Sequence, residues 1–514
     1  MSGKSRIEKS LLNARVNLVF YFVFIVLSFF SRKIFLEHLG SDFLGLSGTL
    51  GNILSFLSLA EMGVGTAVAY TLYKPLDENN HDEIENIVSV FGYIYRKIGI
   101  IVLLGSIIIS LFIPFIFESA DFSYGVIYYV FFSIVLSSLL GYFINYRQIL
   151  LTADQKGYVV TAYLQSASVC KVLIQMASVY YWSNYYLWTT IEIAFGILAC
   201  VILNLKIDKE YPWLKVSVKK GKEVYSQYKE ITRKTKQIFI HRIASFVLNQ
   251  SDQILIFVFV SLKMVAYYGN YTLIATRISQ LFATALDSMG AGVGNLIAEG
   301  DKKKINRVFW ELISVRYWVA GILCFGLYTC IEPFITVWLG KEYILSHVVL
   351  ILLLVNIFIT QTRGTVDMFI SGYGLYSDTW APIVEVSINI ITTVIAAYFY
   401  GIAGILLGKI ISMMVIVVLW KPFFLFKKGM SLSVWSYWKV IFAHLICVAC
   451  SFLSTNLLAN IVKQNINPNE SILSIFLYAI SIILPYTVIY SILMYILTPG
   501  FKCLIHRLFN ILKK

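Results

Sequence analysis

Stretches of roughly 20 or more mostly apolar residues recur from near the amino terminus to the last residues of the chain. A helix needs about 20 such residues to cross a bilayer, whereas outer-membrane strands alternate over segments of about ten. The stretches therefore predict an all-α polytopic membrane protein. Charged residues are only 14% of the 514 residues, which excludes a soluble enzyme with one anchor and a disordered chain.

We expect about fourteen transmembrane helices from the lengths of these stretches and the breaks between them. They lie near residues 16–38, 43–73, 98–118, 122–146, 158–182, 185–205, 238–260, 265–298, 314–338, 346–371, 380–400, 402–420, 438–459 and 472–497. The second and eighth stretches are the longest, so these helices should be long, tilted or broken at glycines.

The distribution of basic residues predicts the orientation of the chain. With the amino terminus inside, 33 of the 42 Lys and Arg residues fall in cytoplasmic segments, 5 fall outside and 4 lie within spans. Because cytoplasmic loops are enriched in Lys and Arg, we expect both termini in the cytoplasm. The net charge of +14 then needs no nucleic acid as partner.

A short glycine motif suggests an internal repeat. Met62-Gly63-Val64-Gly65 returns as Met289-Gly290-Ala291-Gly292, 227 residues later, although a four-residue match also arises by coincidence. An even number of spans per repeat predicts two parallel six-helix lobes around a cavity with alternating openings. The expected domains are an N-lobe (1–205), a basic cytoplasmic loop (206–237), a C-lobe (238–420), two extra helices (421–497) and a basic amphipathic cytoplasmic tail (498–514).

Gly63, Gly65, Gly290 and Gly292 are candidate hinge or packing positions in these lobes. The tail is apolar on one side and basic on the other, so it could lie on the cytoplasmic leaflet and contact anionic lipid.

Ionisable side chains within the spans are the candidate functional residues, because charges at membrane depth are costly and face cavities or partners. The cations Arg32, Lys171, Arg277, Arg363 and Lys409 are candidates for binding an anionic substrate group, phosphate above all. The acids Asp252, Asp287, Asp367 and Glu385 are candidates for pairing or for binding a coupling ion, H⁺ or Na⁺; Glu61, Glu192 and Glu332 are further buried acids.

Two interpretations of Arg363 and Asp367 remain open. Their spacing of four residues places them on one helix face, where they could neutralise each other, or Asp367 could orient Arg363 toward a cavity. Arg277 has no acid three or four residues away, so its partner must come from another helix, water or substrate. Arg32 could instead reach the outer surface, and Lys409 follows Gly404-Ile-Leu-Leu-Gly408, a spacing that permits close helix approach.

Motifs for other chemistry do not occur in the sequence. It holds no GxxxxGK[ST] phosphate loop and no HExxH, and its outside loops are short. Cys447 and Cys450 with His444 have metal-like spacing, but three ligands within one helix leave a coordination shell incomplete, so we expect no metal and no bound cofactor. We expect a transporter rather than an enzyme.

The run LGSDFLGLSGTLGNILSFLSLAEMGVGTAVAYTLYKPLDENNHDEI (39–84) resembles a signature of bacterial Wzx-type polysaccharide-repeat flippases. These belong to the multidrug/oligosaccharidyl-lipid/polysaccharide (MOP) exporter superfamily. Similar segments follow in order along nearly the whole chain: LTADQKGY (151–158), Ser251-Asp252, YYGNYTLI (267–274), SMGAGVGNLIAEGD (288–301), PIVEVSIN (382–389) and GIAGILLGKII (401–411). Lys409 departs from the family pattern, in which a small polar residue is expected.

The resemblance implies two six-helix lobes of the MOP type around a central cavity, plus two extra helices. It implies flipping of undecaprenyl-pyrophosphate-linked oligosaccharide repeat units across the bacterial inner membrane, for O-antigen, lipopolysaccharide or capsule synthesis. The pyrophosphate would meet the cavity cations. A polysaccharide polymerase and chain-length proteins would be the implied protein partners.

Three alternatives stay open. A cation-coupled multidrug exporter of the same superfamily would use a cavity dominated by Asp252, Asp287 and Glu385. A lipid II flippase is the second alternative. A membrane glycan polymerase is the third, although it predicts a large ordered outer loop that the sequence lacks.

Overall fold

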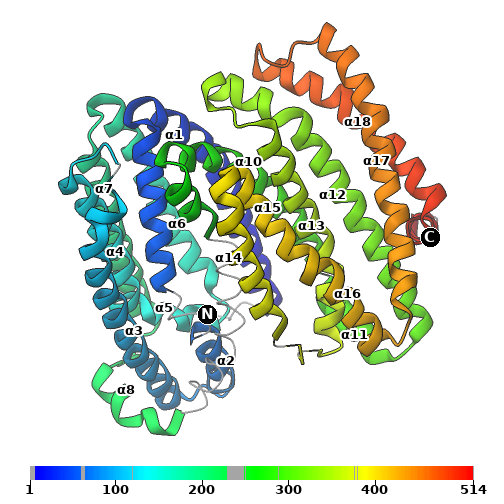
Figure 1. The fold of residues 1–514 in the computed structure, drawn as a ribbon. Coiled ribbons are helices and arrows are strands. Elements are labelled where there is room, and N and C mark those ends of the chain that lie inside the picture. Colours follow the sequence, from blue (N-terminus) through cyan, green and yellow to red (C-terminus); the bar gives the residue numbers. More distant parts are fainter. Residues whose placement is uncertain are drawn as a thin grey trace. The chain divides into compact units, whose positions relative to one another are not determined.

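The computed structural model describes residues 6–58, 64–118, 120–228, 248, 251–287, 289–375, 377–378 and 380–512. The chain forms two compact units, Met1–Ala266 and Tyr267–Lys514, whose boundary falls within α10 (Leu262–Asp287). The helices of each unit are drawn in Figure 1. The described residues form helices and connecting turns without a β-strand, which confirms the predicted fold class.

Unit 1 is built from long helices joined by short turns. Its helices are α1 (Arg6–Leu57), α2 (Val64–Asp77), α3 (His81–Ile116), α4 (Tyr124–Phe143), α5 (Gln148–Ala153), α6 (Gly157–Trp182), α7 (Tyr185–Glu210), α8 (Val218–Val224) and a segment at 251–259. Side-chain caps explain several starts, since Asn80, Ser123 and Asn184 each accept a hydrogen bond from the backbone N–H three residues on.

Unit 2 continues α10 and adds nine further labelled helices among its described residues. They are α11 (Gly290–Glu299), α12 (Lys302–Trp338), α13 (His347–Gly372), α14 (Trp380–Tyr400), α15 (Ile402–Met413), α16 (Lys421–Phe424), α17 (Val434–Asn465), α18 (Ile472–Leu497) and α19 (Pro499–Leu512). Residues 414–420 are helical and join α15 to α16. Residues 425–430 continue the helix beyond α16, so one apolar segment ends at Met430.

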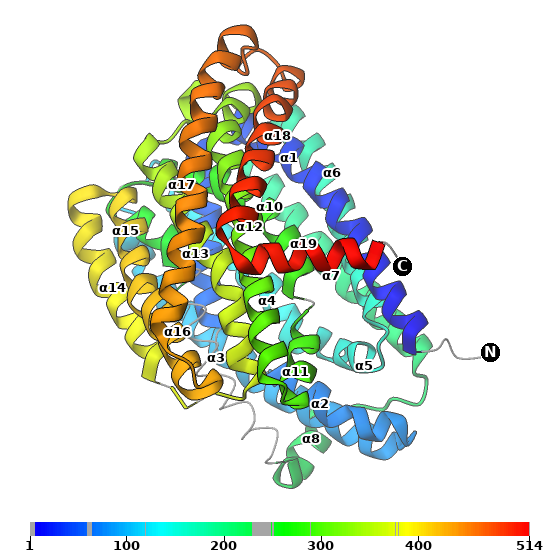
Figure 2. The ribbon, with the colours of Figure 1, turned by 90° about the vertical axis from the view of Figure 1, so that its right-hand side faces the viewer.

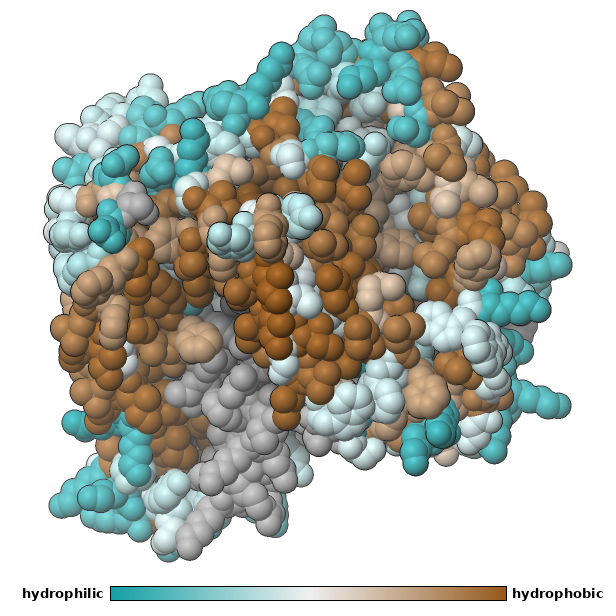
Figure 3. Space-filling model, viewed as in Figure 1, coloured by the Kyte–Doolittle hydropathy of each residue, from teal (hydrophilic) through white to brown (hydrophobic). Residues whose placement is uncertain are grey.

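Twelve segments of the described chain are long and apolar enough to cross a membrane, against the fourteen spans expected. The first expected span and the second as far as Leu57 form the single helix α1, interrupted at Gly40, whose φ of 82° lies in the region that favours glycine. Figure 1 shows the two arms of α1 running in opposite directions from this bend. The end of the second expected span, from Val64, belongs to α2. About half of the seventh expected span, 238–260, lies outside the described residues, and residues 251–259 of it are helical. In both units, hydrophobic side chains cover the middle of the visible helices and hydrophilic ones gather at the ends (Figure 3).

Part of the basic loop expected at 206–237 packs against the end of unit 1 that is predicted to be cytoplasmic. The His81 ring stacks on Trp213 at 3.9 Å between centroids. Glu85 accepts hydrogen bonds from the Lys215 backbone N–H at 2.9 Å and from Lys220 Nζ at 3.2 Å. The described part of this loop is therefore folded against α3.

Lys156 joins three parts of this same end. Its Nζ lies 2.8 Å from Asp154 and 2.9 Å from Glu210, and Tyr211 donates a hydrogen bond to Asp154 at 2.8 Å. Burial works to lower the pKa of Lys156, but the hydrogen bonds to Asp154 and Glu210 outweigh it and raise the pKa above its ordinary value.

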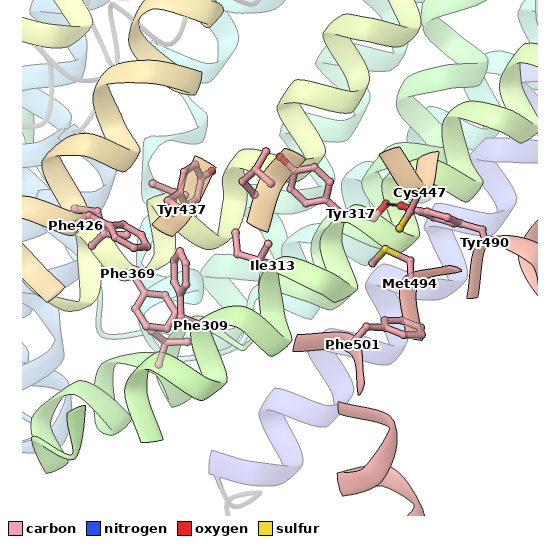
Figure 4. Close-up of a cluster of buried hydrophobic side chains, with 14 of the residues drawn as sticks. Phe309, Ile313, Tyr317, Phe369, Phe426, Tyr437, Cys447, Tyr490, Met494 and Phe501 are labelled. Carbon is pink, nitrogen blue, oxygen red and sulfur yellow. Dashed lines mark hydrogen bonds between the residues drawn. The ribbon is translucent and has the colours of Figure 1, made fainter. Parts of the chain in front are cut away.

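The core of unit 2 gathers around α12. Figure 4 shows Phe309 facing Phe369 and Phe426, and ring centroids lie 5.0 and 5.5 Å from that of Phe309. Farther along α12, the Tyr490 hydroxyl of α18 donates to the Tyr317 carbonyl at 2.9 Å. The two helices that follow residue 430 therefore share one hydrophobic core with α12 and α13.

Two glycines let α15 lie against α14. A Cβ on Gly404 would lie 2.0 Å from the Ala396 carbonyl oxygen, and one on Gly408 would lie 2.4 Å from Thr393 Oγ1. Gly404 and Gly408 therefore permit the close helix approach that their spacing predicts.

We predict that Gly408→Ala lowers the stability of the protein by about 1–3 kcal/mol, because the added methyl group must push the two helices apart. Thermal unfolding of the purified protein in detergent measures the change. Gly51→Ala is the matched control, since no described atom lies within 4 Å of its Cβ. Equal stability of the two variants would contradict the close packing.

We predict that Lys156→Met destabilises its end of unit 1 by about 2 kcal/mol, because two carboxylates lose a charged donor. A raised lysine pKa contributes stability below the unfolded value of ~10.4, and that contribution is lost as pH rises through the higher folded value. Hydrogen exchange of residues 145–158 should show a constant difference between the two proteins near neutral pH and a shrinking one in strong alkali. A difference that grows with pH would refute this account.

Candidate functional site

Unit 2 contains a cavity of about 660 Å³ between α10, α11, α12 and α13. Small residues, among them two glycines of α11, leave the space open, and charged and polar residues from α10, α12 and α13 line it. The lining residues are Ala283, Asp287, Gly290, Gly294, Arg316, Thr360, Gln361, Arg363, Gly364, Asp367, Met368, Ser371 and Gly372.

Arg316 of α12 is the most deeply placed cation of this cavity, with a side chain only 4% exposed. One terminal nitrogen donates to Asp287 Oδ1 at 2.6 Å, and the other donates to the Gln361 carbonyl at 3.3 Å. A Cβ on Gly364 would lie 2.2 Å from the guanidinium, so glycine is required there for the arginine to fit. The Asp287 side chain is 62% exposed, which leaves its pairing with Arg316 open to exchange.

A second charged group lies on the α13 wall. Arg363 Nε donates to Asp367 Oδ2 at 2.7 Å, and Lys421 Nζ of α16 donates to Asp367 Oδ1 at 2.6 Å. Both Arg363 and Asp367 line the cavity. The two interpretations of this pair are thus compatible, because the residues neutralise each other and also face the cavity.

Glu385 of α14 is a buried carboxylate beside this group. It is 4% exposed, and among the described residues none offers a hydrogen bond to its Oε1. It interacts electrostatically with Arg363, Lys421 and Asp367. A buried carboxylate with an unsatisfied oxygen is costly unless it binds a proton or a cation.

Glu385 begins a polar stripe on the buried side of α14. Asn389 and Thr393 follow it at successive intervals of four residues and are also buried. Asn389 Nδ2 donates to Ser412 Oγ of α15 at 3.4 Å. Thr393 Oγ1 has no hydrogen-bond partner within the described part of the chain. The seam between α14 and α15 is therefore polar and only partly satisfied.

The charges of this site balance. Arg316, Arg363 and Lys421 carry three positive charges when Asp287, Asp367 and Glu385 carry three negative ones. Each guanidinium offers several N–H groups in a planar fork, which suits a phosphate or a carboxylate. An incoming anion can therefore take the place of a carboxylate on these cations.

Several predicted residues lie elsewhere in unit 2. Arg277 is half-buried on α10 and interacts with other groups, but it does not line the cavity. Lys409 is half-buried on α15 and also has an interaction partner. Gly290 lines the cavity, whereas Gly292 lines a separate, smaller cleft.

The remaining predicted residues belong to unit 1. Arg32 donates to the Ala266 carbonyl at 2.9 Å. Lys171 forms an ion pair with Glu192 of α7, and Gln175 also donates to Glu192 at 3.1 Å. Asp252 is buried and has an interaction partner. Gly65 lies on α2, and Gly63 falls outside the described residues.

Arg316 and Lys421 were missed as site residues by the sequence analysis, which assigned both to cytoplasmic flanks of spans. Arg316 lies 14 residues into α12, about 21 Å from its first residue. Asp301 caps that helix by accepting from the Lys303 and Lys304 N–H groups. An aspartate directly before three lysines is a helix-start signal that would have placed Arg316 well inside the helix instead of at its flank.

His444, Cys447 and Cys450 do not form a metal site in the structure. His444 Nε2 lies 3.0 Å from Ser314 Oγ, and Cys450 is exposed. Within the described residues, no group of three His, Cys, Asp or Glu side chains could hold a metal ion.

No family model matches the sequence, and no curated protein matches it. Among solved structures, the chain is similar to the lipid II flippase MurJ in an inward closed conformation. The TM-score is 0.60 at 14% identity, over 95% of this chain and 98% of that one. It is also similar to the inward-facing form of a multidrug resistance MATE family transporter of the MOP superfamily, with a TM-score of 0.57 at 13% identity over 82% and 98%.

The outward-facing form of such a MATE transporter matches with a TM-score of 0.51 at 14% identity, over 83% of this chain and 96% of that one. These similar structures are all transporters or flippases. The chain therefore has a fold similar to those of MurJ and of these MATE transporters, and its candidate spans make it a multi-pass membrane protein.

Proposed function

We propose that this protein flips undecaprenyl-pyrophosphate-linked oligosaccharide repeat units across the bacterial inner membrane for surface polysaccharide synthesis. The observation that carries the proposal is the pair of arginines, Arg316 and Arg363, that line one cavity within the membrane-spanning part of unit 2. Charged groups at such a depth are costly and are retained for function.

Pyrophosphate recognition follows from the way the arginines are held. Arg316 is fixed by the Gln361 carbonyl, so its fork keeps its position when its other partner leaves. Asp287 is largely exposed and can move away, and a phosphate oxygen then takes its place on the guanidinium. Arg363, which is paired with Asp367, supplies further donors on the α13 wall, and Lys421 of α16 holds Asp367 from the other side.

Glu385 is the acid that we propose as the coupling site. A pyrophosphate adds negative charge to a site whose charges already balance. Protonation of Glu385 removes one negative charge, and its buried unsatisfied oxygen gives a proton a place to bind. Anion binding and proton binding then favour each other.

The proposed orientation places both termini in the cytoplasm. The excess of Lys and Arg in the segments assigned to that side supports it. A polysaccharide polymerase and chain-length proteins are proposed as downstream partners, because a flipped repeat unit must be joined to others to form a polymer.

A lipid-linked substrate is favoured over a cationic drug by two observations. The MurJ match covers 95% of this chain, whereas the MATE match covers 82%. The cavity also presents two arginines, whose planar N–H forks suit a phosphate group and offer no acceptor to a cationic drug. A multidrug exporter remains the second candidate, because a multidrug resistance MATE transporter has a similar fold and because the exposed carboxylate of Asp287 is accessible to a cationic drug. Lipid II is an alternative lipid-linked substrate.

We predict that Arg316→Ala slows flipping by roughly 10- to 100-fold, because a charged hydrogen bond contributes ~1.5–3 kcal/mol. Translocation of lipid-linked oligosaccharide in proteoliposomes measures the effect. Arg307→Ala is the control, since Arg307 is an exposed arginine on the same helix that does not line the cavity. Full activity of Arg316→Ala would remove this residue from the site.

We predict that the wild-type protein takes up a proton when it binds inorganic pyrophosphate, and that Glu385→Gln takes up less. Calorimetry in buffers of different ionisation enthalpy measures the uptake, and subtraction of the two proteins cancels the proton exchange of pyrophosphate itself. Asp252→Asn is the control for loss of a buried acid in unit 1. Identical uptake by wild type and Glu385→Gln would exclude Glu385 as the coupling group.

A further inference from the structure

A second cleft, of about 330 Å³, lies in unit 2 between α11, α12 and the tail helix α19. Apolar side chains form its floor, among them Val293, Leu296 and Leu312. Its other lining residues include Glu299, Lys304 and Arg507, which carry charge. The cleft is thus lined by both apolar and charged side chains, as an amphiphile requires.

The tail helix is tied to α12 at this cleft by an ion pair between an exposed arginine and a buried glutamate. Arg507 Nη1 of α19 donates to Glu311 Oε2 at 3.0 Å. The Glu311 side chain is 4% exposed, whereas that of Arg507 is 60% exposed. Because a guanidinium has five N–H donors, Arg507 can neutralise Glu311 and still bind an anion from outside.

Positive charge predominates around the cleft. Lys304 is paired with Glu299 at 2.6 Å, but the neighbouring Lys302, Lys303 and Arg307 are exposed. The sequence from Pro499 to Lys514 contains basic residues and no acid. The surface therefore attracts an anionic headgroup.

The orientation of α19 suits a membrane surface. Figure 2 shows α19 lying across the direction of α17 and α18. Phe501 is buried near Trp318, with ring centroids 6.1 Å apart, and Lys502 lies over the Tyr495 ring. Trp and Tyr side chains gather at the level of lipid headgroups, so the contacts of α19 with Trp318 and Tyr495 suit a helix that lies at that level.

We propose that this cleft binds an anionic phospholipid of the cytoplasmic leaflet, with its phosphate at Arg507 and Lys304 and part of one acyl chain on the apolar floor. The combination of floor and cations favours a phospholipid over a free phosphate, which has no chain, and over a neutral lipid, which gains nothing from the cations. The bound lipid holds α19 against α12. This inference does not depend on the proposed transport function.

The test is native mass spectrometry of the full chain in detergent, with phosphatidylglycerol or phosphatidylcholine added. Two cations at a lipid surface predict a preference for phosphatidylglycerol of roughly 30-fold. Equal retention of the two lipids would overturn the proposal. Displacement of phosphatidylglycerol by an equal amount of undecaprenyl phosphate would also overturn it, because the cleft would then belong to the carrier lipid.

Two variants locate the bound lipid. Gly292→Leu should abolish the preferential binding, because its side chain enters the cleft, where no described atom lies within 4 Å of the Cβ position. Gly294→Leu is the matched control, since Gly294 lies on the same helix but lines the larger cavity. Equal binding by these two variants would contradict the location.

A charge variant separates headgroup recognition from folding. The double variant Arg507→Gln with Glu311→Gln removes the cation without leaving a buried carboxylate unpaired. It should lose most of the preference for phosphatidylglycerol, whereas Lys502→Gln on the same helix should keep it. An unchanged preference in the double variant would exclude Arg507 as the headgroup site.

Discussion

A guanidinium group within the membrane-spanning part of a protein needs hydrogen-bond acceptors beside it, and Asp287 and the Gln361 carbonyl meet this need for Arg316 in unit 2. The pair joins α12 to α10, and the second hydrogen bond of Arg316 joins α12 to α13. Asp367 similarly joins α13 to α16 through Lys421. Two ion pairs of the cavity, Arg316–Asp287 between two of its walls and Arg363–Asp367 within α13, are therefore contacts that an anionic substrate would replace.

Because the Arg316–Asp287 pair both links two helices and would exchange with substrate, it connects binding to conformational change. Under the proposed function, a pyrophosphate that displaces Asp287 breaks the bond between α12 and α10 while Arg316 stays anchored to α13. A ligand shifts a conformational equilibrium only by its different affinity for the two states. Exchange of one partner of Arg316 for another supplies such a difference. The close contact of α14 with α15 at Gly404 and Gly408, by contrast, keeps the helix that carries Glu385 in place.

Features of the fold that depend on local sequence could be predicted. Apolar length and basic loops indicated the membrane class, and the i,i+4 spacing indicated the Arg363–Asp367 pair, which lies on one helix. The two predicted spans that meet at Gly40 are joined in one interrupted helix, because a single glycine suffices for the reversal. Partners from other helices could not be predicted. Glu192 pairs with Lys171 across two helices, and Lys421 reaches Asp367 from 54 residues away.

Arg316 shows most clearly what could not be predicted from the sequence. The position of Arg316 along its helix depends on where α12 begins. Its partners Asp287 and Gln361 come from two other helices, so no periodicity within α12 identifies them. Arg277 had the same appearance in the sequence, an arginine without a nearby acid, yet it does not line the cavity. Hydropathy separates membrane from water, but only tertiary packing decides which buried cation faces a cavity.

The most direct test of this account is to identify what occupies the cavity in cells. A photo-crosslinking residue in place of Met368, which lines the cavity, would capture the bound molecule, and the same residue in place of the exposed Phe399 would report general membrane lipid. The account predicts that Met368 captures a phosphate-containing lipid that carries sugar, and that Phe399 does not. Capture of phospholipid alone at both positions would contradict it.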